Sequence, residues 1–203
     1  MILVACALAQ ELRHWKPRAH VEMLVTGIGP VEATAATSRA LATSSPSIVI
    51  NAGIGGGFRG RAAVGDAFAI ETDHFAELGL EDGTPLPPLP GGVRLVERVD
   101  SDAALVGLCS SIGARIGSAI TVSTITTSDV RARALAQRFE AEIEAMEGFA
   151  VLRSAAVAGI PALELRGVSN LVGPREQGGW DFDAGARAVA ALLDRFLDTF
   201  VEK

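Results

Sequence analysis

The chain has 203 residues, of which 49% are hydrophobic and 21% charged, with 18 basic and 24 acidic side chains. This composition excludes intrinsic disorder, which requires low hydrophobicity and dense charge, and the net charge of −6 argues against a protein that wraps nucleic acid. No hydrophobic run approaches the ~18–20 residues of a membrane span. Two cysteines without metal-ligand spacing favour a reducing compartment. We therefore expect one cytoplasmic domain over residues 1–203, with no membrane or nucleic-acid partner.

Short apolar runs alternate with longer amphipathic segments along the chain. The short runs predict strands at Ile2–Leu8, Val21–Thr26, Ser47–Ala52, Val64–Glu71, Ser118–Thr124 and Ala162–Gly167. The longer segments predict helices at Pro30–Ala42, Ala103–Arg115, Arg131–Phe139, Met146–Ala158 and Phe182–Val201. Several strands are apolar almost continuously, which is typical of strands covered on both faces. The alternation predicts an α/β fold, with a mixed, largely parallel sheet between helical layers.

Glycines gather after the third predicted strand. Residues 55–60 satisfy the G-x-G-x-x-G spacing of dinucleotide sites, but a strand follows them where such a site needs the N-terminus of a helix. The stretch Asn51–Gly57 has two interpretations. It is either a tight turn, or a strand end whose missing side chains let a flat ligand lie against the backbone. The proline-rich stretch 83–92 predicts an exposed loop or a mobile flap.

Three polar residues stand at the ends of predicted elements: Glu11 after the first strand, Glu147 at the start of a helix, and Asn170 after the last strand. Each has an ordinary explanation, as a loop residue, a partner of the helix dipole or a turn residue. The alternative is that the three converge on one cleft. The three histidines lack metal-ligand spacing and no nucleophile elbow is present, so the sequence disfavours metal or acyl-enzyme chemistry.

Taken in order, several segments resemble the nucleoside phosphorylase/nucleosidase superfamily over almost the whole chain. The matching landmarks are residues 10–11, 25–29, 51–55, 64–66, 146–148 and 166–170. Within that superfamily the futalosine hydrolase branch is most similar, through residues 73–79 and 169–175 with Trp180 beyond them.

The resemblance implies a three-layer α/β/α sandwich around a mixed, partly barrel-like sheet, a homo-oligomer and no cofactor or metal. It implies hydrolysis of the N-glycosidic bond of futalosine, with release of hypoxanthine, in menaquinone biosynthesis. Phosphorylase relatives hold phosphate with a Gly-Asp-Pro-x-x-Arg loop after the first strand, where this chain carries Glu11. A carboxylate repels phosphate but can orient and deprotonate water, so we expect hydrolysis rather than phosphorolysis.

The resemblance also assigns roles to the three polar residues. Glu11 is the expected general base. Glu147 is expected to bind ribose hydroxyls and stabilise the oxocarbenium-like cation, with Met146 packed against the sugar. Adenosine-type nucleosidases carry an aspartate where this chain has Asn170. An amide can donate to a 6-oxo group and accept from a protonated N7, so Asn170 predicts a preference for hypoxanthine over adenine.

Further residues are expected to bind substrate. The backbone around Gly53, Ile54 and Gly55 is expected near the ribose and base, and Thr126 and Thr127 at the base edge. Arg166 and Ser169 are expected to support Asn170. The carboxylate on the 5′ side of futalosine needs a cationic partner, for which Arg175 and Arg59 are the candidates.

Other functions stay open at this level. Hydrolysis of methylthioadenosine, S-adenosylhomocysteine or aminated futalosine is disfavoured by Asn170. Phosphorolysis of an inosine-like nucleoside is disfavoured by Glu11. The remaining alternative is a non-enzymatic nucleoside-binding module with the same fold.

Overall fold

The computed structural model describes residues 1–80, 82–84, 86–87, 89–174 and 179–201. Its strands are β1 (Ile2–Cys6), β2 (Val21–Val25), β3 (Ile48–Gly57), β4 (Ala67–Phe75), β5 (Arg98–Asp100), β6 (Arg115–Thr121), β7 (Ile143–Ala145) and β8 (Ala162–Leu171). Its helices are α1 (Pro30–Thr43), α2 (Ala103–Ser111), α3 (Asp129–Phe139), α4 (Gly148–Ala158) and α5 (Phe182–Val201), with short 3₁₀ turns η1 (Ala9–Leu12) and η2 (Pro90–Gly92). None of the helices in these ranges is long and apolar enough to cross a membrane.

The strands form one mixed sheet that closes on itself. Strand β8 pairs in parallel with β3 and antiparallel with β4, while β4, β6, β7 and β3 pair in succession. These five strands make a closed ring, from which β1 and β2 extend in parallel beyond β3 and β5 extends beyond β4. The predicted partly barrel-like sheet is therefore confirmed.

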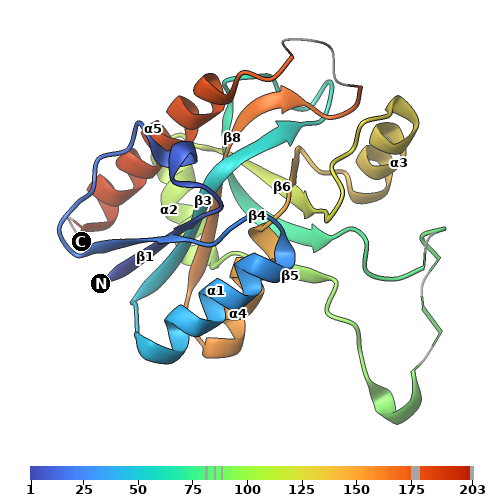
Figure 1. Ribbon diagram of the computed structural model, residues 1–203, viewed down its shortest axis with the longest axis horizontal. Coiled ribbons are helices and arrows are strands. Elements are labelled where there is room, and N and C mark those ends of the chain that lie inside the picture. Colours follow the sequence, from blue (N-terminus) through green and yellow to red (C-terminus); the bar gives the residue numbers. More distant parts are fainter. Residues whose placement is uncertain (81, 85, 88, 175–178, 202–203) are drawn as a thin grey trace.

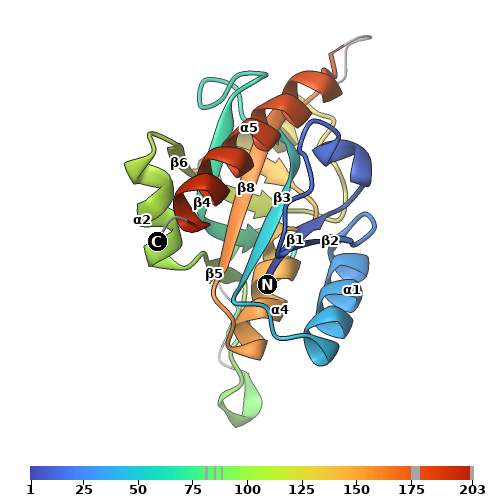
Figure 2. The ribbon, with the colours of Figure 1, turned by 90° about the vertical axis from the view of Figure 1, so that its left-hand side faces the viewer.

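Helices cover both faces of this sheet (Figures 1 and 2). On one face, Leu3 of β1 and Val49 of β3 pack with side chains of α1 and α4. On the other, Val4 and Ile50, the next residues along the same strands, pack with α2 and α5. Successive strand residues point to opposite faces, so one apolar strand supplies both cores. This is the predicted three-layer α/β/α arrangement.

The glycines after the third predicted strand continue that strand, so the interpretation as a tight turn is wrong. Strand β3 runs to Gly57 and pairs with β8 and β7. A Cβ atom at Gly55 would lie 2.8 Å from the side chain of Ile143, and one at Gly57 would lie 2.9 Å from Val168. Glycine is therefore needed where the strands of the ring approach each other closely.

Other boundaries differ from the sequence prediction for local reasons. The short strands β5 and β7 were not predicted, because three-residue runs carry no clear periodicity. Helix α2 ends at Ser111 because Gly113 has a positive φ of 74° and Arg115 already begins β6.

The segment between β4 and β5 extends away from the body of the molecule (Figure 1), and its described residues in 83–92 are mostly exposed, as the proline-rich composition predicted.

Candidate active site

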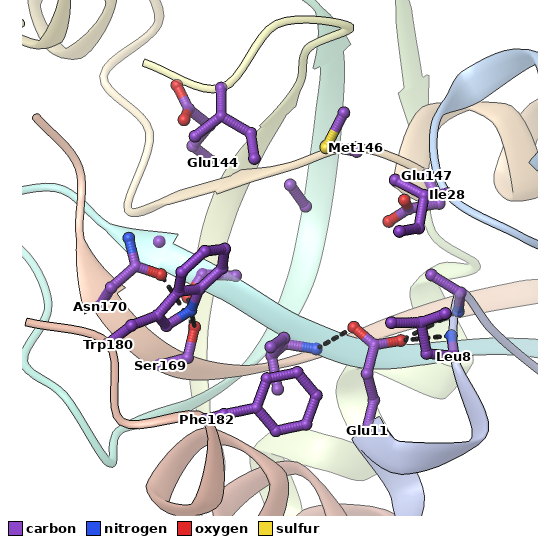
Figure 3. Close-up of a pocket in the computed structure, with 16 residues that line it drawn as sticks. Leu8, Glu11, Ile28, Glu144, Met146, Glu147, Ser169, Asn170, Trp180 and Phe182 are labelled. Atoms are coloured by element: carbon purple, nitrogen blue, oxygen red, sulfur yellow. Dashed lines mark hydrogen bonds between the residues drawn. The ribbon is translucent and has the colours of Figure 1, made fainter. Parts of the chain in front are cut away.

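A cavity of about 500 Å³ opens where β3, β7 and β8 end, beside η1 and the start of α5. This volume suits a small organic ligand. Its lining comprises Ala7, Leu8, Glu11, Ile28, Ile54, Gly55, Gly56, Ile125, Glu144, Ala145, Met146, Glu147, Ser169, Asn170, Trp180 and Phe182. In Figure 3, Glu11 and Glu147 lie at one end and Glu144, Asn170 and Trp180 at the other. We call these the carboxylate end and the amide end.

Glu11 is held rigidly at the carboxylate end. One carboxylate oxygen accepts hydrogen bonds from the backbone N–H groups of Ala7 (3.0 Å) and Leu8 (3.1 Å), and the other from that of Ile54 (3.3 Å). The 3₁₀ turn η1 places Glu11 three residues after Leu8, so that its side chain folds back onto the start of the turn. Burial, opposed in part by Arg166, raises the pKa of Glu11 above its ordinary value. This carboxylate is therefore fixed in place and unusually ready to accept a proton.

Glu147 stands at the start of α4, facing the same end of the cavity. Its Oε1 accepts a hydrogen bond from the backbone N–H of Gly29 (2.9 Å), and its Oε2 lies 3.9 Å from Nη1 of Arg166. Gly29 has a φ of 92°, a conformation that favours glycine, and it directs its N–H at the carboxylate from the start of α1. Three elements distant in sequence thus fix Glu147.

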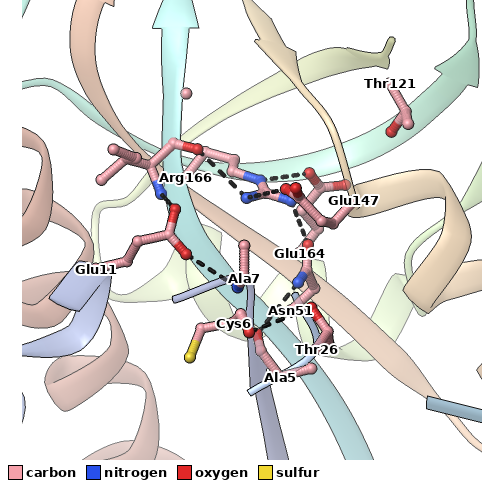
Figure 4. Close-up of polar contacts among 12 residues, drawn as sticks. Ala5, Cys6, Ala7, Glu11, Thr26, Asn51, Thr121, Glu147, Glu164 and Arg166 are labelled. Carbon is pink, nitrogen blue, oxygen red and sulfur yellow. Dashed lines mark hydrogen bonds and ion pairs between the residues drawn. The ribbon is translucent and has the colours of Figure 1, made fainter. Parts of the chain in front are cut away.

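Arg166 lies behind the two carboxylates, fully buried, and does not line the cavity (Figure 4). Its Nε donates to Glu164 (2.8 Å) and its Nη2 to the side-chain oxygen of Asn51. Burial alone would lower the pKa of Arg166, but the charges of Glu164 and Glu147 raise it above its ordinary value. Arg166 is therefore a permanent buried cation that compensates the surrounding carboxylates.

Asp73 is a second buried acid, beside Glu164, the partner of Arg166. Asp73 accepts a hydrogen bond from the hydroxyl of Thr121 (2.8 Å), which in turn accepts one from the backbone N–H of Phe149 (2.9 Å). Burial and the nearby charge of Glu164 raise the pKa of Asp73 well above its ordinary value. A Cβ atom at Gly148 would lie 2.2 Å from a carboxylate oxygen of Asp73 and 2.2 Å from one of Glu164, so the start of α4 must carry glycine.

Asn170 is positioned by a β-bulge at the amide end. Val168 and Asn170 pair with the consecutive residues Gly55 and Gly56, which leaves Ser169 as the extra residue of β8. Nε1 of Trp180 donates to the Ser169 hydroxyl (2.8 Å), and that hydroxyl lies 2.9 Å from Oδ1 of Asn170. A donor thus faces the amide oxygen, while the amide nitrogen donates one hydrogen to the carbonyl of Leu171 (3.2 Å) and keeps its second hydrogen for a ligand.

The sequence analysis missed Glu144, which lies on β7 and lines the amide end. Its Oε1 accepts a hydrogen bond from the backbone N–H of Thr126 (3.0 Å), whereas its Oε2 is buried and has no partner among the described residues. Burial raises the pKa of Glu144 above its ordinary value. A charged residue inside the apolar run 143–146 is the signal that could have revealed it.

The remaining predicted residues are divided between the cavity and its surroundings. Ile54, Gly55, Met146 and Ser169 line the cavity, and Gly53 packs beneath Glu11 and Arg166. Thr126 is buried outside the lining and Thr127 is exposed, while the preceding Ile125 does line it. Binding of the base by the two threonines stays a prediction.

Cations are absent from the described lining of this cavity, which carries the three carboxylates Glu11, Glu144 and Glu147. Arg175 lies outside the described residues, and Arg59 is exposed and does not belong to the lining. No group of three or more His, Cys, Asp or Glu side chains in the described ranges is arranged to hold a metal ion.

The sequence of this chain matches those of known proteins. The pattern of the phosphorylase superfamily matches residues 16–202. The chain is 39% identical over 181 residues to a futalosine hydrolase of Streptomyces coelicolor, covering 85% of this chain and 75% of that protein. It is 32% identical over 179 residues to a futalosine hydrolase of Thermus thermophilus, covering 86% and 80%.

A solved structure shares the fold. The structure of a futalosine hydrolase mutant of Helicobacter pylori superposes with a TM-score of 0.84 at 17% identity, covering 98% of each chain. The chain therefore belongs to the phosphorylase superfamily and, within it, to the futalosine hydrolase family.

Proposed function

We propose that this protein hydrolyses the N-glycosidic bond of futalosine and releases hypoxanthine, without phosphate. The observation that carries the proposal is Glu11, a buried carboxylate held by three backbone N–H groups at the end of the cavity where a phosphorylase would hold an anion. With Glu147 also at this end and no cation in the described lining, phosphate would meet like charge.

Glu11 is the proposed general base. Its raised pKa brings it nearer to the range in which a carboxylate removes a proton from water effectively. The water oxygen forms a bond to C1′ of the ribose and gives a proton to Glu11. The C1′–N9 bond breaks and the purine leaves with its electron pair, taking up a proton.

Glu147 is proposed to bind the ribose hydroxyls and to stabilise the positive charge that develops on the sugar. Its second oxygen lies 3.9 Å from Arg166, which balances the charge from behind the cavity wall. Met146, the preceding residue, is proposed to pack against the sugar.

Asn170 is proposed to bind the base. Its amide oxygen faces the hydroxyl of Ser169, so its nitrogen is the group that can donate to a 6-oxo substituent. A 6-amino substituent would meet this donor with a donor of its own, leaving buried hydrogens unpaired. This supports hypoxanthine over adenine, and Arg175 or Arg59 remains the proposed partner of the 5′ carboxylate.

We further propose that the protein acts in menaquinone biosynthesis in the cytoplasm and needs no cofactor. We also propose that the chain forms a single domain and that several copies associate as a homo-oligomer. Exposed apolar side chains on the edge strand β2, Met23 and Val25, support association with another copy, because paired or covered edges are the stable arrangement. Ile28 is also exposed and lines the cavity. Light scattering of the purified protein measures the number of subunits.

The function is tested by base release from futalosine, aminated futalosine, inosine and methylthioadenosine, each with and without phosphate. We expect hypoxanthine from futalosine, at a rate independent of phosphate. Adenine release from the 6-amino substrates at comparable rates would contradict the role of Asn170, and strict dependence on phosphate would contradict that of Glu11. Ligand binding without product would indicate a binding module.

A further inference from the structure

Glu144 and Asn170 stand on either side of the same glycine. Gly56 of β3 pairs with Asn170 of β8 on one side and with Glu144 of β7 on the other. Neighbouring strands lie about 4.8 Å apart, and the ring is curved, so the backbones of Glu144 and Asn170 are separated by less than about 10 Å. Residues in register on paired strands point to the same face of the sheet. Both residues line the cavity, so they flank a floor that has no side chain.

The two flanking groups differ in hydrogen-bonding character. The amide oxygen of Asn170 faces the hydroxyl of Ser169, and its nitrogen donates one hydrogen to the carbonyl of Leu171, so the second hydrogen is the donor left for a ligand. Glu144 as a carboxylate is purely an acceptor. Its Oε1 is fixed by the backbone N–H of Thr126, and its buried Oε2 has no partner among the described residues. Oε2 itself is buried, but Glu144 lines the cavity, so a turn of its carboxylate toward the cavity would let this unpartnered acceptor take a donor from a ligand.

A 6-oxopurine offers the matching pair of groups. Its O6 is an acceptor and the adjacent N1–H is a donor, whereas a 6-aminopurine presents an amino donor beside an N1 lone pair. We infer that Glu144 accepts the N1–H of the purine base and is, with Asn170, a specificity-determining residue for 6-oxopurines. This inference rests on the proposed function. It adds Glu144 to Asn170 as a reason why the substrate would carry a 6-oxopurine base.

The ionisation of Glu144 is consistent with this role. Burial raises its pKa, but the N–H of Thr126 favours the carboxylate, and a second N–H from the base favours it further. A 6-aminopurine would place the lone pair of N1 against the same carboxylate. The carboxylate thus adds attraction for one base and repulsion for the other, which is how selective sites are commonly built.

Binding of the free bases tests the inference without requiring turnover. Calorimetric titration with hypoxanthine and adenine is carried out on the wild type and on Glu144→Gln, which keeps the size of the side chain. We expect Glu144→Gln to weaken hypoxanthine binding about 10- to 100-fold and to leave adenine binding equal or tighter, as for loss of a hydrogen bond to a charged acceptor. An unchanged ratio of the two affinities would overturn the inference.

Glu142→Gln is the matched control. Glu142 lies two residues earlier and also accepts a hydrogen bond from a backbone N–H, that of Ser118 (2.7 Å), but it does not line the cavity. Its substitution should leave both affinities unchanged. If the Glu144 variant does not fold, 1-methylhypoxanthine with the wild type gives the answer, because it lacks the N1 hydrogen. Equal binding of the methylated and unmethylated bases would overturn the inference.

The outcomes separate this inference from the proposed function. A wild type that does not cleave futalosine, yet binds hypoxanthine in a way that depends on Glu144, contradicts the function and supports the inference. A wild type that cleaves futalosine, while Glu144→Gln keeps the base preference of Glu142→Gln, supports the function and contradicts the inference.

Discussion

The two ends of the cavity both contain buried carboxylates, but they satisfy them differently. At the carboxylate end, Glu11 and Glu147 accept hydrogen bonds from backbone N–H groups of three different segments, and Arg166 balances their charge. At the amide end, Glu144 has one backbone donor and one oxygen without a partner in the described structure. The first arrangement stabilises charge before a ligand arrives, which suits chemistry. The second leaves a polar group for the ligand to satisfy, which suits recognition.

Glu11→Gln should have the largest effect on activity. The amide fits the same space but cannot take a proton, so we expect kcat for base release to fall about 10²- to 10⁴-fold, with binding of the free base at the amide end largely retained. Base release is followed by absorbance and binding by calorimetry. Glu71→Gln, at an exposed position of β4 outside the cavity lining, is the control and should keep full activity. A normal kcat for Glu11→Gln would contradict the proposal that the carboxylate end performs the chemistry and the amide end recognises the base.

Arg166→Met tests whether the carboxylate end depends on its buried cation. Removing the guanidinium leaves Glu164 and Glu147 buried without compensation, which should lower the free energy of unfolding by about 3–5 kcal/mol. Urea unfolding measures the loss.

The control is Arg98→Met. Arg98 pairs with Asp100 (2.9 Å) at an exposed position, so its loss should cost about 0–1 kcal/mol. Adding Glu164→Leu to Arg166→Met should recover part of the stability, because it removes one of the uncompensated charges. Equal losses for the two arginine variants would contradict the account of the buried network.

Asn170→Asp tests the amide end. A protonated carboxyl can donate to N7 of the purine and accept from a 6-amino group, so the ratio of kcat/KM for aminated futalosine to that for futalosine should rise about tenfold or more. Ser44→Ala, remote from the cavity, is the control and should leave the ratio unchanged. No gain for the 6-amino substrate would count against recognition by Asn170.

The pH dependence of kcat/KM should distinguish Glu11 from an ordinary glutamate. Burial raises the pKa of Glu11 above 4.5, and the base must be ionised to act. Activity is therefore lost as the pH falls through this raised pKa, and the acidic limb of the profile lies at a higher pH than for an exposed glutamate. The residual activity of Glu11→Gln should lack this limb. A limb at or below 4.5 would contradict the assignment of Glu11 as the base.

The sequence predicted much of the framework because its signals are local. Apolar runs of the length of a strand, amphipathic segments and a proline at the start of α1 depend only on neighbouring residues, and they fixed the order of the longer elements. Short strands such as β7 were not predicted, since three residues define no period. Glu144 on β7 was also missed as a site residue, because nothing in one short apolar run shows that its charged residue will line a cavity.

The sequence by itself determined which residue types stand at the ends of the strands, including Glu11, Glu147 and Asn170. The resemblance predicted a partly barrel-like sheet, but only the tertiary structure decided that β3, β8, β4, β6 and β7 are the strands that close it and that Glu144 and Asn170 flank Gly56. It also decided that Arg166, expected beside Asn170, lies instead behind Glu11 and Glu147. The physical reason is that these are contacts between segments far apart in the chain, set by strand register and by close packing at glycine, whereas sequence periodicity reports only each segment's own faces.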